Sequence, residues 1–395
     1  MFVLFKNILS FGRSGFFRKR PAPLADRLLA DALRLAEIPS PSPKEEKRAA
    51  FVTGRLASLG LVPHVFESGS LYVRLHSGNS TEPVNKEPVL LFTSLISARW
   101  HPTESLSRLD PVNASGAGLA DSLGPAALIA MAESFCARRF PLSRDLSLLF
   151  AVRAMDDPEN QYPLLTGNPR YRPFAAIGVR GLSLGRVIHS LGFCRMRIAV
   201  AAGKVINGKT AAMAEAVAAA LVNTARDLQG ISWDGAGRVR FYLCRIEAAA
   251  QGGAIAAAAR RSPDRGFLEC ELESVDRGLL DMAMNVIRAT AKKNGESFSV
   301  SVTVETLSFI PPGEQEHCAS LFEMLKTEMK KLKIKIHEEE GADPASLFSA
   351  EGIPSLSLGL AEGYQGTDQD SINIDSVEKG RRLLEGFIAG AGAMA

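Results

Sequence analysis

The stretch that decides the fold runs Ser115-Gly-Ala-Gly-Leu-Ala-Asp-Ser-Leu-Gly-Pro-Ala-Ala-Leu-Ile-Ala-Met131. Its first two glycines, Gly116 and Gly118, let the backbone turn tightly, and the residues from Pro125 onward are almost all apolar. This pattern predicts a loop that leads into a helix packed against a sheet on much of its surface. Asp121 lies at the predicted start of that helix. A carboxylate there can cap the free backbone N–H groups, or it can serve a site at the edge of an α/β sheet.

The segments around this helix predict the rest of an α/β domain. Short apolar runs are typical of buried strands, and apolar residues at a spacing of three or four are typical of helices. Helices are predicted at Pro21–Ile38, Lys44–Leu59, Glu314–Leu332 and Val377–Ala391. Strands are predicted at Val62–Phe66, Leu71–Leu75, Val89–Ile96, Leu146–Val152, Lys333–His337 and Ile353–Leu358, with a chain break at 341–344 and a loop at Ala361–Asp370.

Between the elements predicted up to residue 152 and those predicted from residue 314 lies a self-contained set of six predicted elements. In order they are Met196–Ala201, Thr210–Leu228, Val239–Ile246, Phe267–Ser274, Val275–Lys293 and Phe298–Phe309. The order β-α-β-β-α-β is that of a two-layer, ferredoxin-like α+β domain. The predicted organisation is therefore a basic segment 1–23, a discontinuous α/β domain of residues 24–194 plus 310–395, and an inserted domain of residues 195–309. Such an arrangement usually places a cleft between its parts.

Composition narrows the classes of partner and compartment. The net charge of +3 is small for a chain of 395 residues, so we expect no nucleic-acid partner. The five cysteines are scattered and form no CxxC pair, which predicts a reduced, cytoplasmic protein with neither a disulfide framework nor a zinc knuckle. No apolar run is long enough to span a bilayer.

The first twenty residues combine five phenylalanines with basic residues and contain no acid. Such a segment can make weak contact with an anionic membrane surface. It can equally be an unstructured terminus. Both interpretations stay open from the sequence.

Four motifs in a fixed order carry a resemblance to a known family. They are Leu35-Ala-Glu-Ile-Pro-Ser40, Gly118-Leu-Ala-Asp-Ser-Leu-Gly124, Gly185-Arg-Val-Ile-His-Ser-Leu-Gly192 and Gly352-Ile-Pro-Ser-Leu-Ser-Leu-Gly359. From Leu24 to its end the chain resembles the M20 family of zinc aminopeptidases and aminoacyl-amide hydrolases, in particular the tripeptidase-like branch. The resemblance implies a catalytic-type α/β domain interrupted by a dimerisation domain. It also implies a small peptide or amino-acid-like ligand and a homodimer.

Members of this family hold two zinc ions with five side chains and use a glutamate as general base. Asp121 falls where the family has its bridging aspartate. The resemblance places Ser94 and Ile96 at the family's His-x-Asp, Arg180 at an acidic ligand, and Gly366 at the last histidine. Serine is a poor zinc ligand, and arginine cannot coordinate zinc at all.

The family's Glu-Glu pair corresponds to Asp156-Asp157. By the resemblance, Asp156 stands at the general-base position and Asp157 at a metal-ligand position. Each side chain is one methylene shorter than glutamate, and Asp157 can equally be a turn residue before proline. His101 is a conceivable substitute ligand or a loop residue. His189, at the entry to the insert, suits a packing or hinge role better than a ligand role.

Three functional hypotheses follow. The first is a non-catalytic relative without a cofactor, in which Arg180, Asp121 and Asp157 form a charge cluster and the protein acts as a binding or regulatory subunit, paired with itself or with a paralogue. The second is a hydrolase that holds zinc, or Mn²⁺ or Mg²⁺ through oxygen ligands from Asp121, Asp157 and either Asp156 or Asp368. The third makes the basic N-terminal segment the functional part and the body a scaffold at a membrane.

Overall fold

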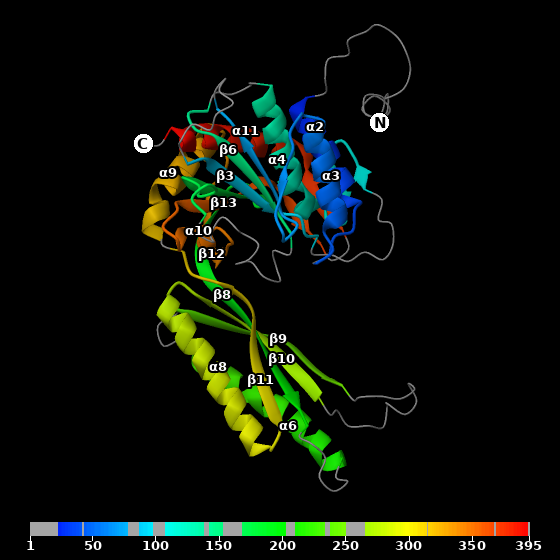
Figure 1. Ribbon diagram of the computed structural model, residues 1–395, viewed down its shortest axis with the longest axis vertical. Helices are drawn as coiled ribbons and strands as arrows, with labels where there is room; N and C mark the ends of the chain where they lie inside the picture. The colour runs from blue at the N-terminus through cyan, green and yellow to red at the C-terminus, as the bar shows by residue number, and fades with distance from the viewer. Residues whose placement is uncertain are drawn as a thin grey trace. The chain divides into compact units, whose positions relative to one another are not determined.

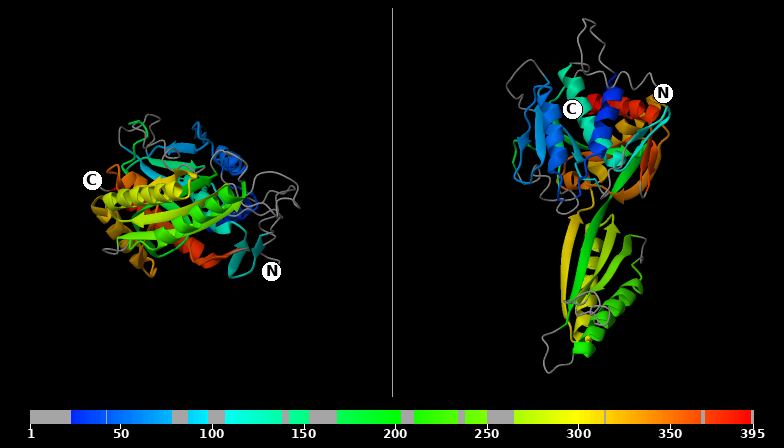
Figure 2. Two further views of the ribbon diagram at one scale, coloured as in Figure 1. Left: turned by 90° about the horizontal axis from the view of Figure 1, so that it is seen from below. Right: turned by 90° about the vertical axis from the view of Figure 1, so that its right-hand side faces the viewer.

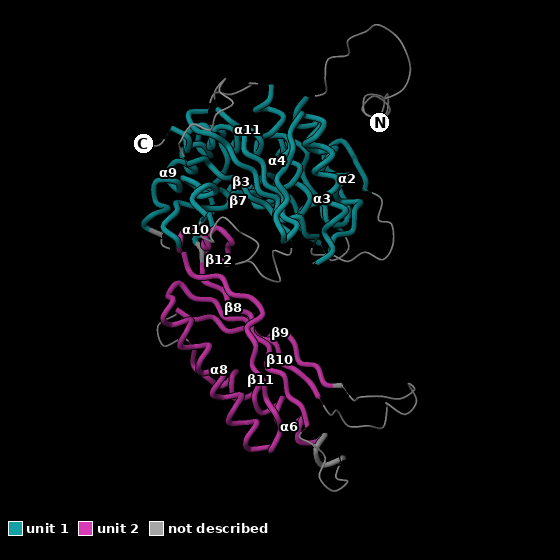
Figure 3. The backbone as a smooth tube through the Cα atoms, in the orientation of Figure 1, with its two compact units in different colours: residues 1–189, 314–339, 351–395 teal, residues 190–313, 340–350 magenta. Residues whose placement is uncertain are grey.

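The computed structural model describes residues 23–41, 43–77, 87–97, 107–137, 142–152, 168–202, 210–233, 238–249, 265–313, 315–366 and 369–393. The chain divides into two compact units (Figure 3). Unit 1 comprises residues 1–189, 314–339 and 351–395, and unit 2 comprises residues 190–313 and 340–350. Residues 1–20, which carry the basic side chains of the N-terminal segment, lie outside the described residues.

Unit 1 is built on a mixed sheet of six strands. Their order is β1 (His64–Val65), β2 (Leu71–Leu75), β6 (Leu146–Ala151), β3 (Val89–Ser94), β7 (Ala175–Leu182) and β13 (Ser355–Ala361). The last four strands of this order run parallel to one another. On one side of them, β2 pairs antiparallel with β6, and β1 pairs antiparallel with β2. The predicted strand at 62–66 shortens to two residues, since its exposed Val62 and Val65 have no core to face.

One buried cluster joins this sheet to its helices (Figure 1). The helices are α2 (Leu24–Ala36), α3 (Glu46–Ala57), α4 (Leu119–Cys136), α9 (Gln315–Lys331) and α11 (Ile374–Gly392). The approach of α4 to β7 depends on glycine, because a Cβ atom at Gly181 would lie 1.7 Å from the carbonyl oxygen of Ala120. The carboxyl end of β7 is thereby held against the first turn of α4.

A small second sheet in unit 1 contradicts the predicted loop at 361–370. Its order is β14 (Gly363–Gln365), β15 (Asp370–Asn373), β5 (Asn113–Gly116) and β4 (Arg108–Leu109). These strands are short and polar and lack the alternating apolar pattern that announces a strand. The pairing of β15 with β5 places Asp370 opposite Gly116, just before α4.

Unit 2 is a two-layer α+β module, as the insert's sequence predicts. Its elements are β8 (Arg186–Ala201), α6 (Thr210–Gln229), β9 (Val239–Ala249), β10 (Arg265–Ser274), α8 (Arg277–Ser297) and β11 (Ser301–Ile310), and the strand order is β11-β8-β10-β9. Both helices lie on one face of this sheet (Figure 2). The alternate side chains Met196, Ile198, Leu268 and Leu272 are buried beneath them.

The prediction of a strand at 333–337 is wrong. The strand of this region is β12 (His337–Ala342), which begins at the last residue of the predicted range. It pairs with β8 and runs through the expected break at 341–342. Three consecutive glutamates discourage a strand prediction. Each is compensated by a basic side chain, since Glu338 meets Lys326, Glu339 meets Arg186 and Glu340 meets Arg240.

Within the described part of the chain, no helix is both long and apolar enough to cross a bilayer.

Candidate functional site

Two of the positions that the resemblance singles out lie at the carboxyl ends of adjacent parallel strands. Ser94 ends β3, and Arg180 lies near the end of β7. The two strands pair from Val89 with Ala175 to Phe92 with Gly178. Ser94 and Arg180 each follow this last pair by two residues. Ligand sites of open α/β sheets lie at this edge.

Asp121 belongs to the first turn of α4 and is not its N-cap residue. The N-cap residue is Gly118, whose φ of 69° is left-handed and whose place is therefore suited to glycine. No side chain of the cap residue bonds the helix. The N-cap position predicted for Asp121 is therefore wrong, because the glycine turn starts the helix two residues before it. The Asp121 side chain is half-buried.

The cap comes instead from a distant part of the chain. The fully buried Asp370 of β15 accepts a hydrogen bond from the backbone N–H of Ala120 through Oδ2, at 3.0 Å. Gly366 directly follows β14, in which Gln365 pairs with Asp370. The position where the resemblance expects a histidine thus follows the residue paired with Asp370, and it carries no side chain.

The sequence analysis missed one residue of this region, Arg48 of α3. Its side chain is fully buried. Nε donates to the carbonyl of Ile38 at 3.1 Å, and Nη2 donates to Ser122 Oγ at 3.0 Å. Nη1 donates to the carbonyl of Ile96 at 3.3 Å. The signal was present, because Arg48 continues the buried row of Val52 and Leu56 at a spacing of four.

The charge of Arg48 is set against that of Asp121. Burial lowers the pKa of Arg48 to about 10, and the nearby Asp121 carboxylate opposes that shift. A pKa of about 10 leaves the guanidinium protonated at neutral pH. The positive charge that acts on Asp121 at neutral pH therefore belongs to the chain itself.

The remaining predicted site residues cannot be placed. Asp156, Asp157, Asp368 and His101 lie outside the described residues. The predicted cluster of Arg180, Asp121 and Asp157 therefore stays a prediction.

Histidines elsewhere in the described residues serve other contacts. His76 Nδ1 lies 3.0 Å from Asp145 Oδ2, at the amino end of β6 and thus at the sheet edge opposite Ser94. His189 Nε2 lies 3.1 Å from Glu338 Oε2. Among the described residues, no group of three or more His, Cys, Asp or Glu side chains could hold a metal ion.

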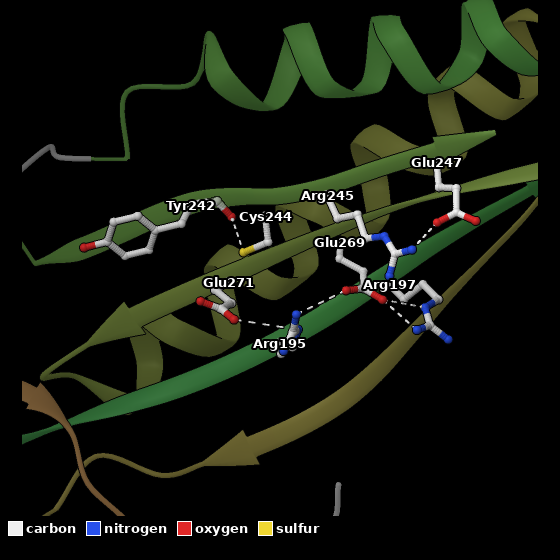
Figure 4. A network of polar contacts seen from close by, with 8 residues as sticks. All are labelled: Arg195, Arg197, Tyr242, Cys244, Arg245, Glu247, Glu269 and Glu271. Carbon is white, nitrogen blue, oxygen red and sulfur yellow. Dashed lines mark hydrogen bonds and ion pairs between the residues drawn. The ribbon is translucent and has the colours of Figure 1, made fainter. Parts of the chain in front are cut away.

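Unit 2 carries a separate charge network on the face of its sheet that its helices leave uncovered (Figure 4). Glu269 of β10, only 4% exposed, accepts from Arg197 and Arg195 of β8. Arg195 also meets Glu271, and Arg245 meets Glu247. Acids and bases alternate here from strand to strand and neutralise one another, so this network stabilises the sheet.

Comparison with known proteins decides the fold. No family model matches the sequence, and no curated protein is similar to it in sequence. Solved structures match over nearly the whole chain. A tripeptidase from Staphylococcus aureus is 14% identical with a TM-score of 0.66, covering 94% of this chain and 99% of its own. The fold is that of the M20 peptidases.

Two further structures support this assignment. A dinuclear metal-binding peptidase of the M20 family from Bacillus subtilis is 13% identical with a TM-score of 0.61, covering 93% of this chain and 98% of its own. A dipeptidase from Saccharomyces cerevisiae is 13% identical with a TM-score of 0.67, covering 94% of this chain and 97% of its own. At these identities the likeness establishes the M20 fold alone.

Proposed function

We propose that this protein is a non-catalytic M20-like protein that acts as a binding or regulatory subunit. The observation that supports the proposal is the set of residue types at the positions where the resemblance expects metal ligands. Ser94 accepts a hydrogen bond from the N–H of Ile96 at 3.1 Å, so its hydroxyl completes a turn at the end of β3. Arg180 presents a guanidinium, and Gly366 presents no side chain.

This set of side chains does not fit two zinc ions. Each zinc takes about four donors from imidazole, thiolate or carboxylate groups. Arginine has no acceptor atom and keeps its proton. The buried guanidinium of Arg48 adds a further positive charge beside Asp121, which disfavours a divalent cation at the same place.

A binding role is compatible with the M20 fold that this protein retains. The M20 fold extends over more than nine-tenths of the chain. We propose a small peptide or an amino-acid-like molecule as ligand, and association as a homodimer or with a paralogue. The structure forms no disulfide among the five cysteines, all of which are described. This supports a cytoplasmic location.

The test is metal analysis of the purified protein together with hydrolysis assays on dipeptides and tripeptides. We expect well under one metal ion per chain, and no hydrolysis with or without added Zn²⁺ or Mn²⁺. About two zinc ions per chain, accompanied by peptide hydrolysis, would reject the proposal.

One observation favours a second candidate, a hydrolase with a rebuilt metal site. The carboxylate of Asp370 lies at the first turn of α4, which also carries Asp121, so two acids approach one helix end. Oxygen ligands of this kind favour Mg²⁺ or Mn²⁺. Peptide or N-acyl amino acid hydrolysis that requires added Mn²⁺ and is lost in Asp121→Asn would establish this candidate in place of the first.

A further inference from the structure

Arg48 links three segments that meet at the candidate site. Its guanidinium donates to Ile38, which follows α2, to Leu95 and Ile96, which follow β3, and to Ser122 of α4. These bonds use all three of its nitrogens, and the side chain has no exposed surface. The labels of α3, α4 and β3 in Figure 1 locate the helices and the strand involved. A guanidinium bonded on all sides in this way is fixed in one position.

Neutral acceptors do not explain why a charge is buried here. Three of the four acceptors are backbone carbonyls and the fourth is a hydroxyl. Taking a guanidinium out of water is costly unless an opposite charge lies close by. Arg48 Nη2 bonds Ser122 and lies against Gly118, and Asp121 shares the helix face of these two residues, so its carboxylate acts on the Arg48 charge. Nη2 also lies 3.5 Å from where a Cβ atom of Gly118 would be, so the charge sits against the turn that starts α4.

We propose that Arg48 is a built-in cation that balances Asp121, ties α3 to the start of α4 and excludes a divalent metal ion from this end of the sheet. The inference rests on the proposed function in one respect, which is that Asp121 binds no metal in the native protein. It goes further by naming the group that supplies the positive charge. It also predicts that removal of this group restores some affinity for a cation.

The experiment is a double-mutant cycle of Arg48→Met and Asp121→Asn, read by thermal unfolding with and without millimolar MnCl₂. Methionine fills much of the space of arginine and carries no charge. We expect Arg48→Met to lower the unfolding midpoint by roughly 10 °C, because it leaves four buried acceptors without their donor. The double variant should recover part of that loss, since neither charge is then left without the other. If the midpoint of the double variant falls by the sum of the decreases in the two single variants, the inference is overturned.

The response to Mn²⁺ separates a charge role from simple packing. MnCl₂ should leave the midpoint of the wild-type protein unchanged and raise that of Arg48→Met by about 2–4 °C, through binding to the folded state. The rise should vanish in the double variant, which lacks the Asp121 carboxylate. Equal responses of wild type and Arg48→Met would refute the exclusion of metal.

A second comparison keeps the inference testable if Arg48→Met does not fold. Asp121→Asn alone leaves the buried guanidinium without this counter-charge and should lower the midpoint by several degrees, about 5 °C. The matched control is Asp375→Asn, because Asp375 is an exposed acid in the first turn of α11. The control should change the midpoint by no more than about 2 °C. Equal shifts in both variants would overturn the inference.

These outcomes are distinct from failure of the proposed function. Stoichiometric metal with hydrolysis in the wild-type protein would reject the proposed function. Additive losses in the cycle would reject the role of Arg48 even in a metal-free, inactive protein.

Discussion

The carboxylate of Asp370 accepts a hydrogen bond from the backbone N–H of Ala120 at 3.0 Å, across 250 residues of sequence. Helix starts leave backbone N–H groups without partners inside the helix, and a local Ser, Thr, Asn or Asp usually satisfies one. In α4 the cap residue is Gly118, which has no side chain to do so. Asp370 of β15 therefore caps the start of the helix that carries Asp121.

This relationship predicts the cost of losing the carboxylate. Asp370→Ala should lower the free energy of unfolding by about 1–3 kcal/mol, because a buried N–H loses its charged acceptor. Asp370→Asn keeps an oxygen acceptor and should cost less. Urea unfolding measures both changes. Asn373→Ala, which removes the local cap of α11, is the matched control with an expected cost of about 0.5–2 kcal/mol. An Asp370→Ala protein as stable as wild type would contradict this interpretation.

Close packing of β7 against α4 predicts a contrast between two glycines. A Cβ atom at Gly181 would overlap the backbone of Ala120, whereas one at Gly54 in α3 would have no atom within 4 Å. Gly181→Ala should destabilise the protein by about 3 kcal/mol or more, since backbone must move. Gly54→Ala should stabilise it by up to about 1 kcal/mol through helix propensity. Thermal unfolding of the two variants tests the contrast, and a tolerated Gly181→Ala would show that β7 and α4 can separate.

Acid stability should depend on Asp145. Burial alone would raise the pKa of this carboxyl, but the N–H of Ser77 and the side chains of Arg74 and His76 outweigh it and hold the pKa below 3.8. Because the folded-state pKa is the lower one, the stabilisation is present above about pH 4 and is lost as the pH falls through the folded-state value. Asp145→Asn should therefore be less stable at pH 7 and lose less stability on acidification than wild type. Unfolding midpoints between pH 7 and pH 2 would show the opposite trend if Asp145 were not ionised in the folded protein.

The charge network of unit 2 predicts unequal roles for two neighbouring glutamates. Glu269 is buried between Arg195 and Arg197, whereas Glu271 is about one-quarter exposed and has one longer contact of 3.6 Å. Glu269→Gln should lower the free energy of unfolding of unit 2 by about 1–3 kcal/mol. Glu271→Gln should cost no more than about 1 kcal/mol. Hydrogen exchange of β8 and β10 amides reports on this unit, and equal losses of protection would refute the ranking.

Much of the fold could be predicted because local patterns agree with it. The apolar run after Pro125 is the buried helix α4, and the alternating apolar positions of the insert form the face beneath α6 and α8. The prediction of strands failed where the local sequence pattern does not match the pairing that the strand makes in the folded protein. Strand β12 carries three glutamates and β14 is short and exposed, so neither shows a strand's periodicity. Strand β7 includes glycine and arginine and was also missed.

The candidate site divides in the same way. Motif order predicted that Asp121, Ser94 and Arg180 lie in one neighbourhood, and the structure puts Ser94 and Arg180 near the carboxyl ends of the adjacent strands β3 and β7. The sequence suggested no role for Arg48, since one arginine in an amphipathic helix is ordinarily taken for a surface residue. Nor did it suggest that Asp370 completes α4.

By itself the sequence determined the class of the fold and the insert of six elements, and it predicts substitutions at the family's ligand positions. These depend on residue types at fixed spacings, which a single chain displays directly. Only the tertiary structure decided which cation acts on Asp121 and which acid caps α4. The first interaction joins Arg48 to Asp121, and the second joins residues that are 250 positions apart. Their energy depends on burial and distance, and neither quantity exists until the sheet has brought the segments together.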